Sequence, residues 1–512
     1  MAPLTLLVVL PLLGALAVAA VPRRRPEVIF PLAIAVSLPP LAVVLWILAS
    51  FEPGDPGFQL VESVRWSAEL GIGWQLGIDG ISLFLVVLTT VLMPLAIAAS
   101  KSIVEGRKAY MVSMLVLETG LLGVFVALDL VVFFAFFEIV LVPMYLLIGL
   151  WGSERRRYAA MKFVLYTAIG SAFLLAGILA LGLAAGEAGG ALASFDFRDV
   201  AALDLSVGAQ RWLFVAFALA FAIKVPVFPL HTWLPDAHTE APTAGSVVLA
   251  GVLLKMGTYG LVRFNLTLFP QASVDFAGIM VALGVVGIVY GAAVAIVQPD
   301  VKRLVAYSSI SHLGFVVLGT FALTVQGIGG GIFLGVSHGL TTGALFLLIG
   351  MLYDRRHTRR IDAFGGIASV MPVYAGLFLF MAFASAGLPA LSGFVGEFTV
   401  LLGSFPSYPA AAIAAGSGVV LAAVYLLWAY ERIFTGPVTE PENEALDDLD
   451  GRELAILVPL VALVLVLGLY PRPVLDRIEP AVSAVLERIE AETGHVAPAP
   501  ALGLQVGGGE EG

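Results

Sequence analysis

Residues 213–230 read LFVAFALAFAIKVPVFPL, an apolar run long enough to span a membrane that contains a single lysine, Lys224. Pro226 and Pro229 follow that lysine directly. Because proline removes a backbone N–H donor and clashes with the preceding turn, we expect the helix to break beside the charge. A broken helix with a charge at membrane depth is tolerated only inside the protein or along an internal cavity. The stretch therefore predicts a polytopic membrane protein with a functional site at this break.

The composition of the whole chain supports a membrane fold. Of 512 residues, 60% are hydrophobic and only 12% are charged, which leaves too few polar side chains to cover a soluble protein of this size. We count about fourteen apolar stretches of spanning length. They lie near residues 3–21, 28–51, 78–99, 110–128, 130–151, 162–185, 212–234, 244–266, 276–297, 305–323, 331–353, 371–404, 409–431 and 454–470. The prediction is an all-α polytopic membrane protein.

Clusters of basic residues predict how the spans are oriented. Every cluster follows an odd-numbered span, and the clusters contain Arg23, Arg24, Arg25, Lys101, Arg107, Lys108, Arg155, Arg156, Arg157, Lys302, Arg303, Arg355, Arg356, Arg359 and Arg360. Cytoplasmic loops of membrane proteins are enriched in Lys and Arg. The loops after odd spans are therefore predicted to be cytoplasmic, and both termini are predicted to lie outside.

A short internal repeat relates two parts of the chain. The pattern G-x-x-F-L-L-x-G occurs at 170–177 in span 6 and again at 343–350 in span 11, and the same offset places Lys224 in span 7 on Glu397 in span 12. Five spans separate the copies, so the copies must face opposite ways, as in transporters whose ion sites lie near the midplane. Gly387, Pro389 and Gly393 precede Glu397 just as prolines follow Lys224, which predicts discontinuous helices at spans 7 and 12.

These features predict two inverted five-helix repeats within one membrane domain. The predicted parts are 1–109 (spans 1–3 with an outside loop at 52–77), 110–266 (first repeat, spans 4–8), 276–434 (second repeat, spans 9–13) and 454–512 (last span and outside tail). Within the tail, 474–490 is expected to form a short amphipathic helix.

Four charged side chains fall near the centres of predicted spans. They are Glu138, Lys224, Lys255 and Glu397, and a charge at that depth is costly enough to indicate function. Interhelical salt bridges or snorkelling side chains are the alternative, which we disfavour because two of the four are related by the repeat. We predict that Glu138 controls the protonation of Lys224, that Lys224 passes a proton toward Lys255 and His312, and that Glu397 is the terminal site.

Other polar residues in the spans are weaker candidates. His312 follows several serines and coincides in the repeat with the position next to that of Glu138, and His338 also has a serine beside it; both are predicted to support a water chain. Glu118 has a relay role or a packing role as equal alternatives. His231 and His238 flank Pro235-Asp236, where capping of a loop is at least as probable as proton entry. Asp129, at the outer end of its span, is expected to face water.

Several kinds of chemistry are excluded or find no support. The chain has no cysteine, which excludes a thiolate-held iron–sulfur cluster, a Cys-ligated zinc or a disulfide framework. It has no Walker A sequence, and the glycines at 327–331 follow no predicted strand, so we interpret them as a helix linker. Basic residues form no patch for nucleic acid. The energy for transport must come from another protein.

Several motifs resemble the antiporter-like subunits of respiratory complex I, the proton-pumping NADH–quinone oxidoreductase. The resemblance is carried by FEIVLVPMY at 137–145, KVPVFPLHTWLPDAH at 224–238, EAPT at 240–243, LKMGTYG at 254–260, DVKRL at 300–304, AYSS at 306–309 and SHLG at 311–314. It covers residues 70–435 strongly and the remainder in span pattern only. Large subunits of multisubunit sodium/proton antiporters and of membrane-bound hydrogenases are similar.

The resemblance implies a function, a membrane and partners. In that family the residues matching Glu138, Lys224, Lys255, His312 and Glu397 form a hydrated polar axis, and glutamate at 397 and the short C-terminal tail favour the M type, chain 4 in organelles. It implies an enzyme subunit without its own redox site, in a bacterial inner membrane with both termini periplasmic. NAD, FMN, iron–sulfur clusters and quinone are expected in partner subunits. L-type and N-type subunits and membrane lipids are the expected partners, and the family has a small hairpin near loop 52–77.

Three other functions remain as alternatives. A sodium/proton antiporter subunit or a hydrogenase subunit would use the same lysines. A structural scaffold would tolerate loss of Glu138 and Lys224 without loss of pumping. A stand-alone solute transporter is disfavoured, because no polar cavity lining beyond the proton-type residues is evident in the sequence.

Overall fold

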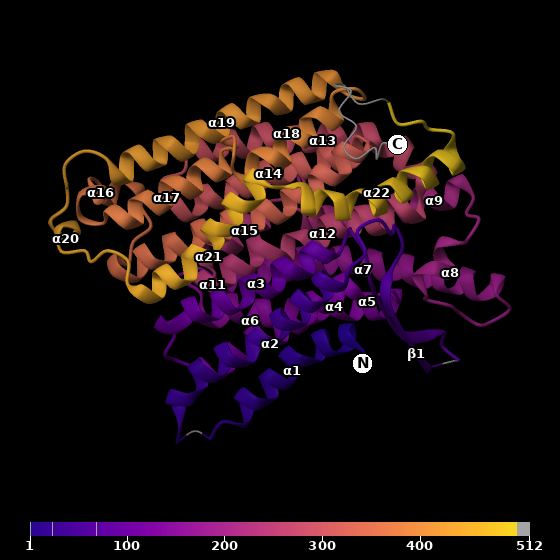
Figure 1. Ribbon diagram of the computed structural model, residues 1–512, viewed down its shortest axis with the longest axis horizontal. Coiled ribbons are helices and arrows are strands. Elements are labelled where there is room, and N and C mark those ends of the chain that lie inside the picture. The colour runs from indigo at the N-terminus through magenta and orange to yellow at the C-terminus, as the bar shows by residue number, and fades with distance from the viewer. Residues whose placement is uncertain (1, 23, 68, 499–512) are drawn as a thin grey trace, which may run out of the picture.

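The computed structural model describes residues 2–22, 24–67 and 69–498 (Figure 1). Within this part of the chain, 13 helices are long and apolar enough to cross a membrane, which confirms the predicted all-α polytopic fold. Eleven of these spans are built on α1 (Pro3–Ala20), α2 (Ile29–Ser50), α3 (Leu83–Ala99), α4 (Arg107–Val126), α5 (Leu130–Ile139) with α6 (Leu141–Trp151), α7 (Arg156–Ala188), α9 (Val207–Lys224), α13 (Pro270–Ile296), α14 (Val301–Phe321), α15 (Val325–Arg356) and α19 (Pro409–Phe434). The other two are α21 (Gly451–Leu469) and the segment 243–266.

The segment 243–266 alternates between α-helical and π-helical pitch, with three changes along its length. Helix α11 (Thr243–Val248) continues through π-helical Leu249–Leu253 into α12 (Leu254–Gly260) and π-helical Leu261–Leu266. Such π-helical turns occur often at functional sites. The remaining helices are α8 (Phe197–Ala201), α10 (Trp233–Glu240), α16 (Ile367–Val370), α17 (Pro372–Ser385), α18 (Ser392–Ser404), α20 (Pro441–Glu444) and α22 (Arg472–Thr493). Helix α22 matches the amphipathic helix predicted at 474–490.

Both predicted helix breaks are present. Helix α9 ends at Lys224 and α10 begins only at Trp233, while the predicted span 371–404 is divided into α17 and α18, of 14 and 13 residues. At about 1.5 Å per residue neither half crosses a membrane alone. The inverted relation of the two repeats stays a prediction.

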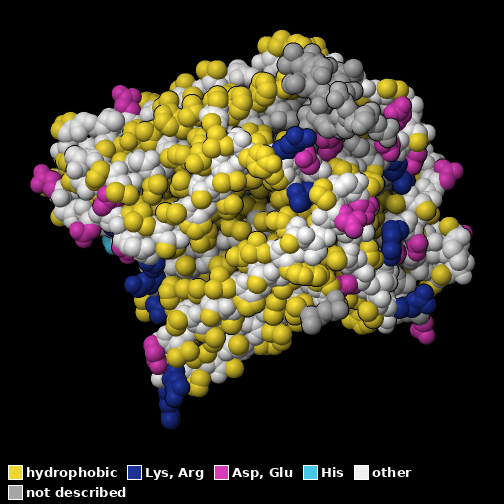
Figure 2. Space-filling model, viewed as in Figure 1, with side chains coloured by type: hydrophobic (Ala, Val, Ile, Leu, Met, Phe, Trp, Pro, Cys, Tyr) yellow, Lys and Arg dark blue, Asp and Glu magenta, His cyan; other side chains and the backbone are white. Residues whose placement is uncertain are grey.

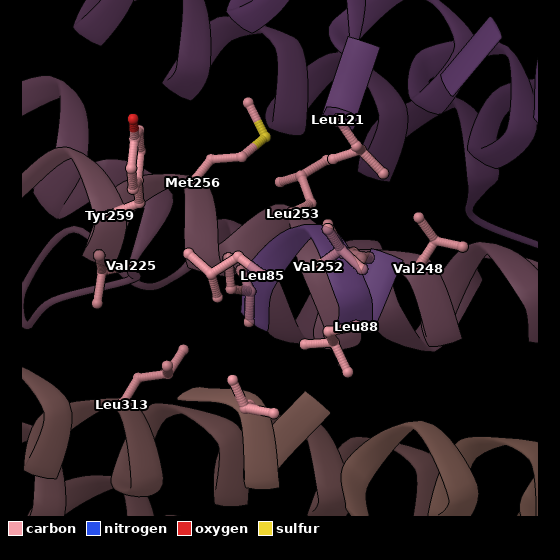
Figure 3. Close-up of a cluster of buried hydrophobic side chains, with 14 of the residues drawn as sticks. Leu85, Leu88, Leu121, Val225, Val248, Val252, Leu253, Met256, Tyr259 and Leu313 are labelled. Carbon is pink, nitrogen blue, oxygen red and sulfur yellow. The ribbon is translucent and has the colours of Figure 1, made fainter. Parts of the chain in front are cut away.

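The helices that carry the predicted site form the centre of the bundle. Every residue of the apolar 18-residue stretch is buried in α15 and in the segment 243–266, but only 28% of the corresponding residues are buried in α2 and α21. Figure 3 shows Leu253 and Met256 from the central segment among side chains of neighbouring helices, with Leu121 of α4 facing Leu253. In Figure 1, α1 and α2 lie along one flank and α19 along the opposite flank.

A small β-hairpin lies at one end of the bundle, as the resemblance implied. Strands β1 (Gln59–Ser67) and β2 (Ile72–Ile78) pair antiparallel. The prediction that Asp129 faces water is wrong, because this residue is fully buried. Its carboxylate caps α5 by accepting from the Val131 and Val132 N–H groups, and it accepts from Gly73 N of the hairpin at 2.8 Å. Asp129 lies at the end of its span as predicted, but its carboxylate hydrogen-bonds to strand β2 and does not face water.

The glycine-rich segment 327–331 belongs to the first turns of α15. The prediction of a helix linker at this segment is wrong. A Cβ on Gly327 would lie 2.6 Å from Gly319 O, and one on Gly330 would lie 2.9 Å from Val400 N. These glycines let α14 and α18 approach α15 closely, which is the common use of small residues between membrane helices.

A buried ion pair that the sequence did not reveal joins the end of the hairpin to the central segment. Arg263 Nη2 donates to Asp79 Oδ2, and the two side chains are 6% and 4% exposed. The Arg263 guanidinium also lies 4.7 Å from the centre of the Phe58 ring. Loss of one partner would leave an uncompensated buried charge.

We expect Asp79→Ala to lower the free energy of unfolding by about 3–5 kcal/mol, because Arg263 is left unpaired inside the protein. The melting temperature of the purified protein measures this. Asp362→Ala is the control, since its partner Arg360 is 66% exposed, and it should leave the melting temperature unchanged. Replacing both buried partners, as Asp79→Leu with Arg263→Met, should recover much of the loss; a double variant less stable than Asp79→Ala would contradict this account.

Candidate functional site

Lys224 lies buried at the break between α9 and α10. The residue is 1% exposed, its Nζ lies 4.7 Å from the centre of the Phe137 ring, and no described residue hydrogen-bonds to that Nζ. Helix α12 packs directly on this residue, since a Cβ on Gly257 would lie 2.9 Å from Lys224 Cβ. The lysine is thus held in an aromatic and aliphatic setting, where an unpaired charge is costly.

Glu138 lies near Lys224 but is bonded elsewhere. It occupies the last turn of α5, where the helix is interrupted before α6 begins at Leu141. Its Oε1 accepts a hydrogen bond from the Ser171 hydroxyl of α7, and the side chain is only half-buried. The predicted direct control of Lys224 by Glu138 therefore has no hydrogen bond in this conformation, and the Phe137 ring lies against the lysine instead.

Two pairs of predicted residues are in contact at the centre of the bundle. Lys255 contacts His338, and His312 contacts Glu397. Lys255 Nζ lies 2.7 Å from His338 Nδ1 and donates to Ala250 O at 2.5 Å. The His338 and His312 rings follow, with 5.7 Å between their centres, and His312 Nδ1 lies 2.9 Å from Glu397 Oε1. All four residues are at most 3% exposed.

The break between α17 and α18 makes room for the Glu397 carboxylate. Gly387 lies in this break with φ of +76°, and a Cβ there would be 2.6 Å from Glu397 Oε2. On the other side of the imidazole, His312 Nε2 is 3.2 Å from Ser385 Oγ and 3.3 Å from Tyr425 OH. Sequence reasoning missed both hydroxyls, because only the fold brings α17 and α19 to α14.

The remaining predicted residues, Glu118, His231 and His238, lie outside the series of Lys255, His338, His312 and Glu397. Glu118 on α4 is fully buried, and none of the described residues hydrogen-bonds to its carboxylate oxygens. His238 is buried and stacks on Phe346 with 4.7 Å between ring centres. His231 stacks on Phe228. His238 has no hydrogen bond from either ring nitrogen, although the Ser246 hydroxyl donates to its backbone carbonyl at 3.0 Å, as in a loop cap.

A polar cavity of 180 Å³ opens beside the end of α14 where the basic clusters lie. Lys302, Glu240 and Arg359 are among its lining residues. Lys302 Nζ donates to Ala241 O at 2.5 Å. Lys302 was counted only as a loop charge from the sequence, since its burial depends on the segment before α11.

The described residues contain no group of three or more His, Asp or Glu side chains that could hold a metal ion. What the arrangement can do is exchange protons, because each of its members donates or accepts according to its protonation state.

Comparison with known proteins assigns the family. Residues 127–422 match the family model described as the NADH:quinone oxidoreductase/Mrp antiporter transmembrane region, and residues 58–124 match the amino terminus of NADH-ubiquinone oxidoreductase chain 4. The chain belongs to this NADH:quinone oxidoreductase/Mrp antiporter family.

Similar members of the family are M-type proteins. NADH-quinone oxidoreductase subunit M of Rhodobacter capsulatus is 48% identical, over 90% of each chain, and subunit M of Mycobacterium tuberculosis is 40% identical, over 98% of this chain and 96% of the other. A chain in the structure of respiratory complex I from Thermus thermophilus with bound NADH is 34% identical, with a TM-score of 0.86 over 95% of this chain and 99% of that one. The predicted resemblance to the M type is confirmed.

We expect Gly387→Ala to lower proton translocation by this family member, because a Cβ there strains the backbone and displaces the Glu397 carboxylate from His312. The measurement is the initial rate of proton uptake in vesicles that contain the assembled complex. Gly416→Ala on α19 is the matched control, since nothing lies within 4 Å of a Cβ at that position. Equal proton uptake in Gly387→Ala and in wild type would show that the position of the Glu397 carboxylate beside Gly387 has no part in transport.

Proposed function

We propose that this chain conducts protons as the M-type membrane subunit of a NADH–quinone oxidoreductase in a bacterial inner membrane. The observation that supports this most strongly is the buried series Lys255–His338–His312–Glu397, which is closed by two contacts of 2.7 and 2.9 Å. Charges in a membrane interior are expensive and mark ion pathways. Electron transfer in other subunits would supply the energy.

The proposed route has one gap that water must bridge. The His338 and His312 rings have their centres 5.7 Å apart, and among the residues that the structure describes none hydrogen-bonds to His338 Nε2. The hydroxyls of Ser337 on α15 and Ser392 on α18, 2.7 Å apart, are buried polar groups that could hold water beside this gap. Glu397 is the proposed terminal site. Because Gly387 has no side chain beside Glu397 Oε2, another proton carrier could hydrogen-bond to this second oxygen.

The polar cavity beside Lys302 is the proposed inlet. It leads from the end of the bundle with the basic clusters, which we propose to be cytoplasmic, toward His238 and then Lys255. Both termini then lie on the periplasmic side. A proton held by Lys302 or Glu240 would pass inward through His238, whose two ring nitrogens have no other partner in this conformation.

Glu138 and Lys224 are the proposed control point. The Glu138 side chain is only half-buried, and we propose that a neighbouring L-type or N-type subunit reaches it. If the Glu138 carboxylate approached Lys224, protonation of the lysine would become more favourable, and if it withdrew, less favourable. A difference of about 1.4 kcal/mol would change the protonation equilibrium of Lys224 tenfold.

The main alternative is a sodium/proton antiporter subunit. The family model includes Mrp antiporters, and the fold is shared with a chain of the Mrp complex of Dietzia, which has a TM-score of 0.78 at 22% identity. Proton uptake that persists in sodium-free medium would favour the oxidoreductase, whereas a strict requirement for sodium would favour the antiporter.

We expect Glu138→Gln to lower NADH-driven proton uptake at least about tenfold, since losing about 1.4 kcal/mol at a transfer step corresponds to that factor. Uptake is measured in vesicles with the purified complex, after native gel electrophoresis has shown normal assembly. Glu187→Gln, at an exposed position of α7, is the control and should pump normally. Normal uptake in Glu138→Gln with normal assembly would leave the chain as a scaffold.

A further inference from the structure

An apolar groove lies on the face of the bundle formed by α2, α3, α15, α21 and α22. Its volume is 310 Å³, within the range of about 300–1,000 Å³ that ligand pockets occupy. Figure 2 shows this face as largely hydrophobic, with a hollow near its centre and Lys or Arg side chains at the edge of the hydrophobic area. All lining side chains are apolar except one, and they include Leu48, Leu88, Leu340 and Leu467.

The one polar residue that lines the groove is Arg477 of α22. Its Nη1 donates to Pro473 O at 2.8 Å within the same helix, and its buried Nε has no hydrogen-bond partner in the part of the chain that the structure describes. The neighbouring Asp476 lies 3.4 Å from Arg472. The guanidinium of Arg477 therefore keeps donors available for an acceptor that enters the groove, and a guanidinium fits a phosphate better than any other side chain does.

The position of Arg477 is that of a lipid headgroup. Helices α2 and α21 end at Ser50 and Leu469 on the side of the bundle where α3 begins at Leu83. Helix α22 then packs at the start of α3, where a Cβ on Gly80 would lie 1.9 Å from Arg477 O. The guanidinium is thus placed at the level where the apolar segments meet water, while the rest of the groove extends along their apolar sides.

We propose that this groove binds one phospholipid, with an acyl chain against Leu88 and Leu340 and the phosphate on Arg477. A groove of this kind that opens to a bilayer holds neither water, which would find no polar partners along its length, nor an empty space, which would forfeit contacts with lipid. The charge at one end and the apolar walls together match the two parts of a phospholipid. This proposal does not depend on the proposed proton route.

The lipid would also close the outer wall of the central helices. Val336 and Leu340 of α15 line the groove and flank His338, which contacts Lys255 from the other side of the same helix. An acyl chain held there keeps water from the lipid side of α15. The same site therefore gives the buried histidine a defined and dry flank.

The test uses phosphatidylglycerol that carries a nitroxide in the middle of one acyl chain, added to vesicles that contain the purified complex. Electron paramagnetic resonance separates motionally restricted label from label in the free bilayer. Arg477→Ala should weaken the restricted binding at least about tenfold, as expected for loss of a charge-assisted contact. Arg472→Ala on the same helix is the matched control, because Arg472 does not line the groove, and it should bind as wild type does.

A second variant keeps the headgroup contact and fills the groove. Val336→Phe should abolish the restricted signal although Arg477 is intact, so the test does not depend on Arg477→Ala being stable. The same nitroxide on an uncharged fatty acid methyl ester should show weak binding that is insensitive to Arg477→Ala. Equal restricted signals in wild type, Arg477→Ala and Val336→Phe, or no restricted signal in wild type because a partner subunit covers the groove, would overturn the proposal.

Discussion

A bilayer offers no hydrogen-bond partners to backbone groups or charges within the spans, so both must be sheltered inside the protein, and the other features of the structure depend on this constraint. Helix α9 stops at Lys224, and α17 stops short of α18, so both breaks leave backbone groups without helical partners. They are accommodated in the interior, where α12 packs on the first break and Glu397 fills the space beside Gly387. Breaks and charges occur together because each needs the same shelter from lipid.

The central helices and the peripheral helices have different tasks as a result. Helices α14 and α15 and the segment 243–266 are buried almost throughout and carry His312, His338 and Lys255. Peripheral helices such as α2 and α21 expose their apolar side chains, which is normal when lipid is the solvent. The polar series Lys255–His338–His312–Glu397 lies in the buried centre of the bundle, among apolar side chains.

Much of this was predictable, because membrane depth leaves a strong mark on sequence. Apolar runs defined the spans, prolines beside Lys224 and glycines before Glu397 predicted the breaks, and the resemblance predicted the hairpin. The direct contacts were not predictable: Lys255 lies on His338, which the sequence ranked below His312, and Ser385 and Tyr425 reach His312 only through tertiary packing. The sequence did not single out Asp79 or Arg263, since nothing local indicates that residues so far apart in the chain would pair in the interior. The glycines of 327–331 were misread for a similar reason, because glycine marks both a flexible linker and a close helix contact.

The central claim is that Lys255 carries a proton in the interior of the membrane during turnover. The most direct test is the ratio of protons translocated to electrons transferred for Lys255→Met in the assembled complex, since methionine keeps an unbranched side chain but cannot bind a proton. The account predicts a ratio clearly below that of wild type, or electron transfer that stops with pumping. A variant that reduces quinone at the normal rate with the full wild-type ratio would contradict it.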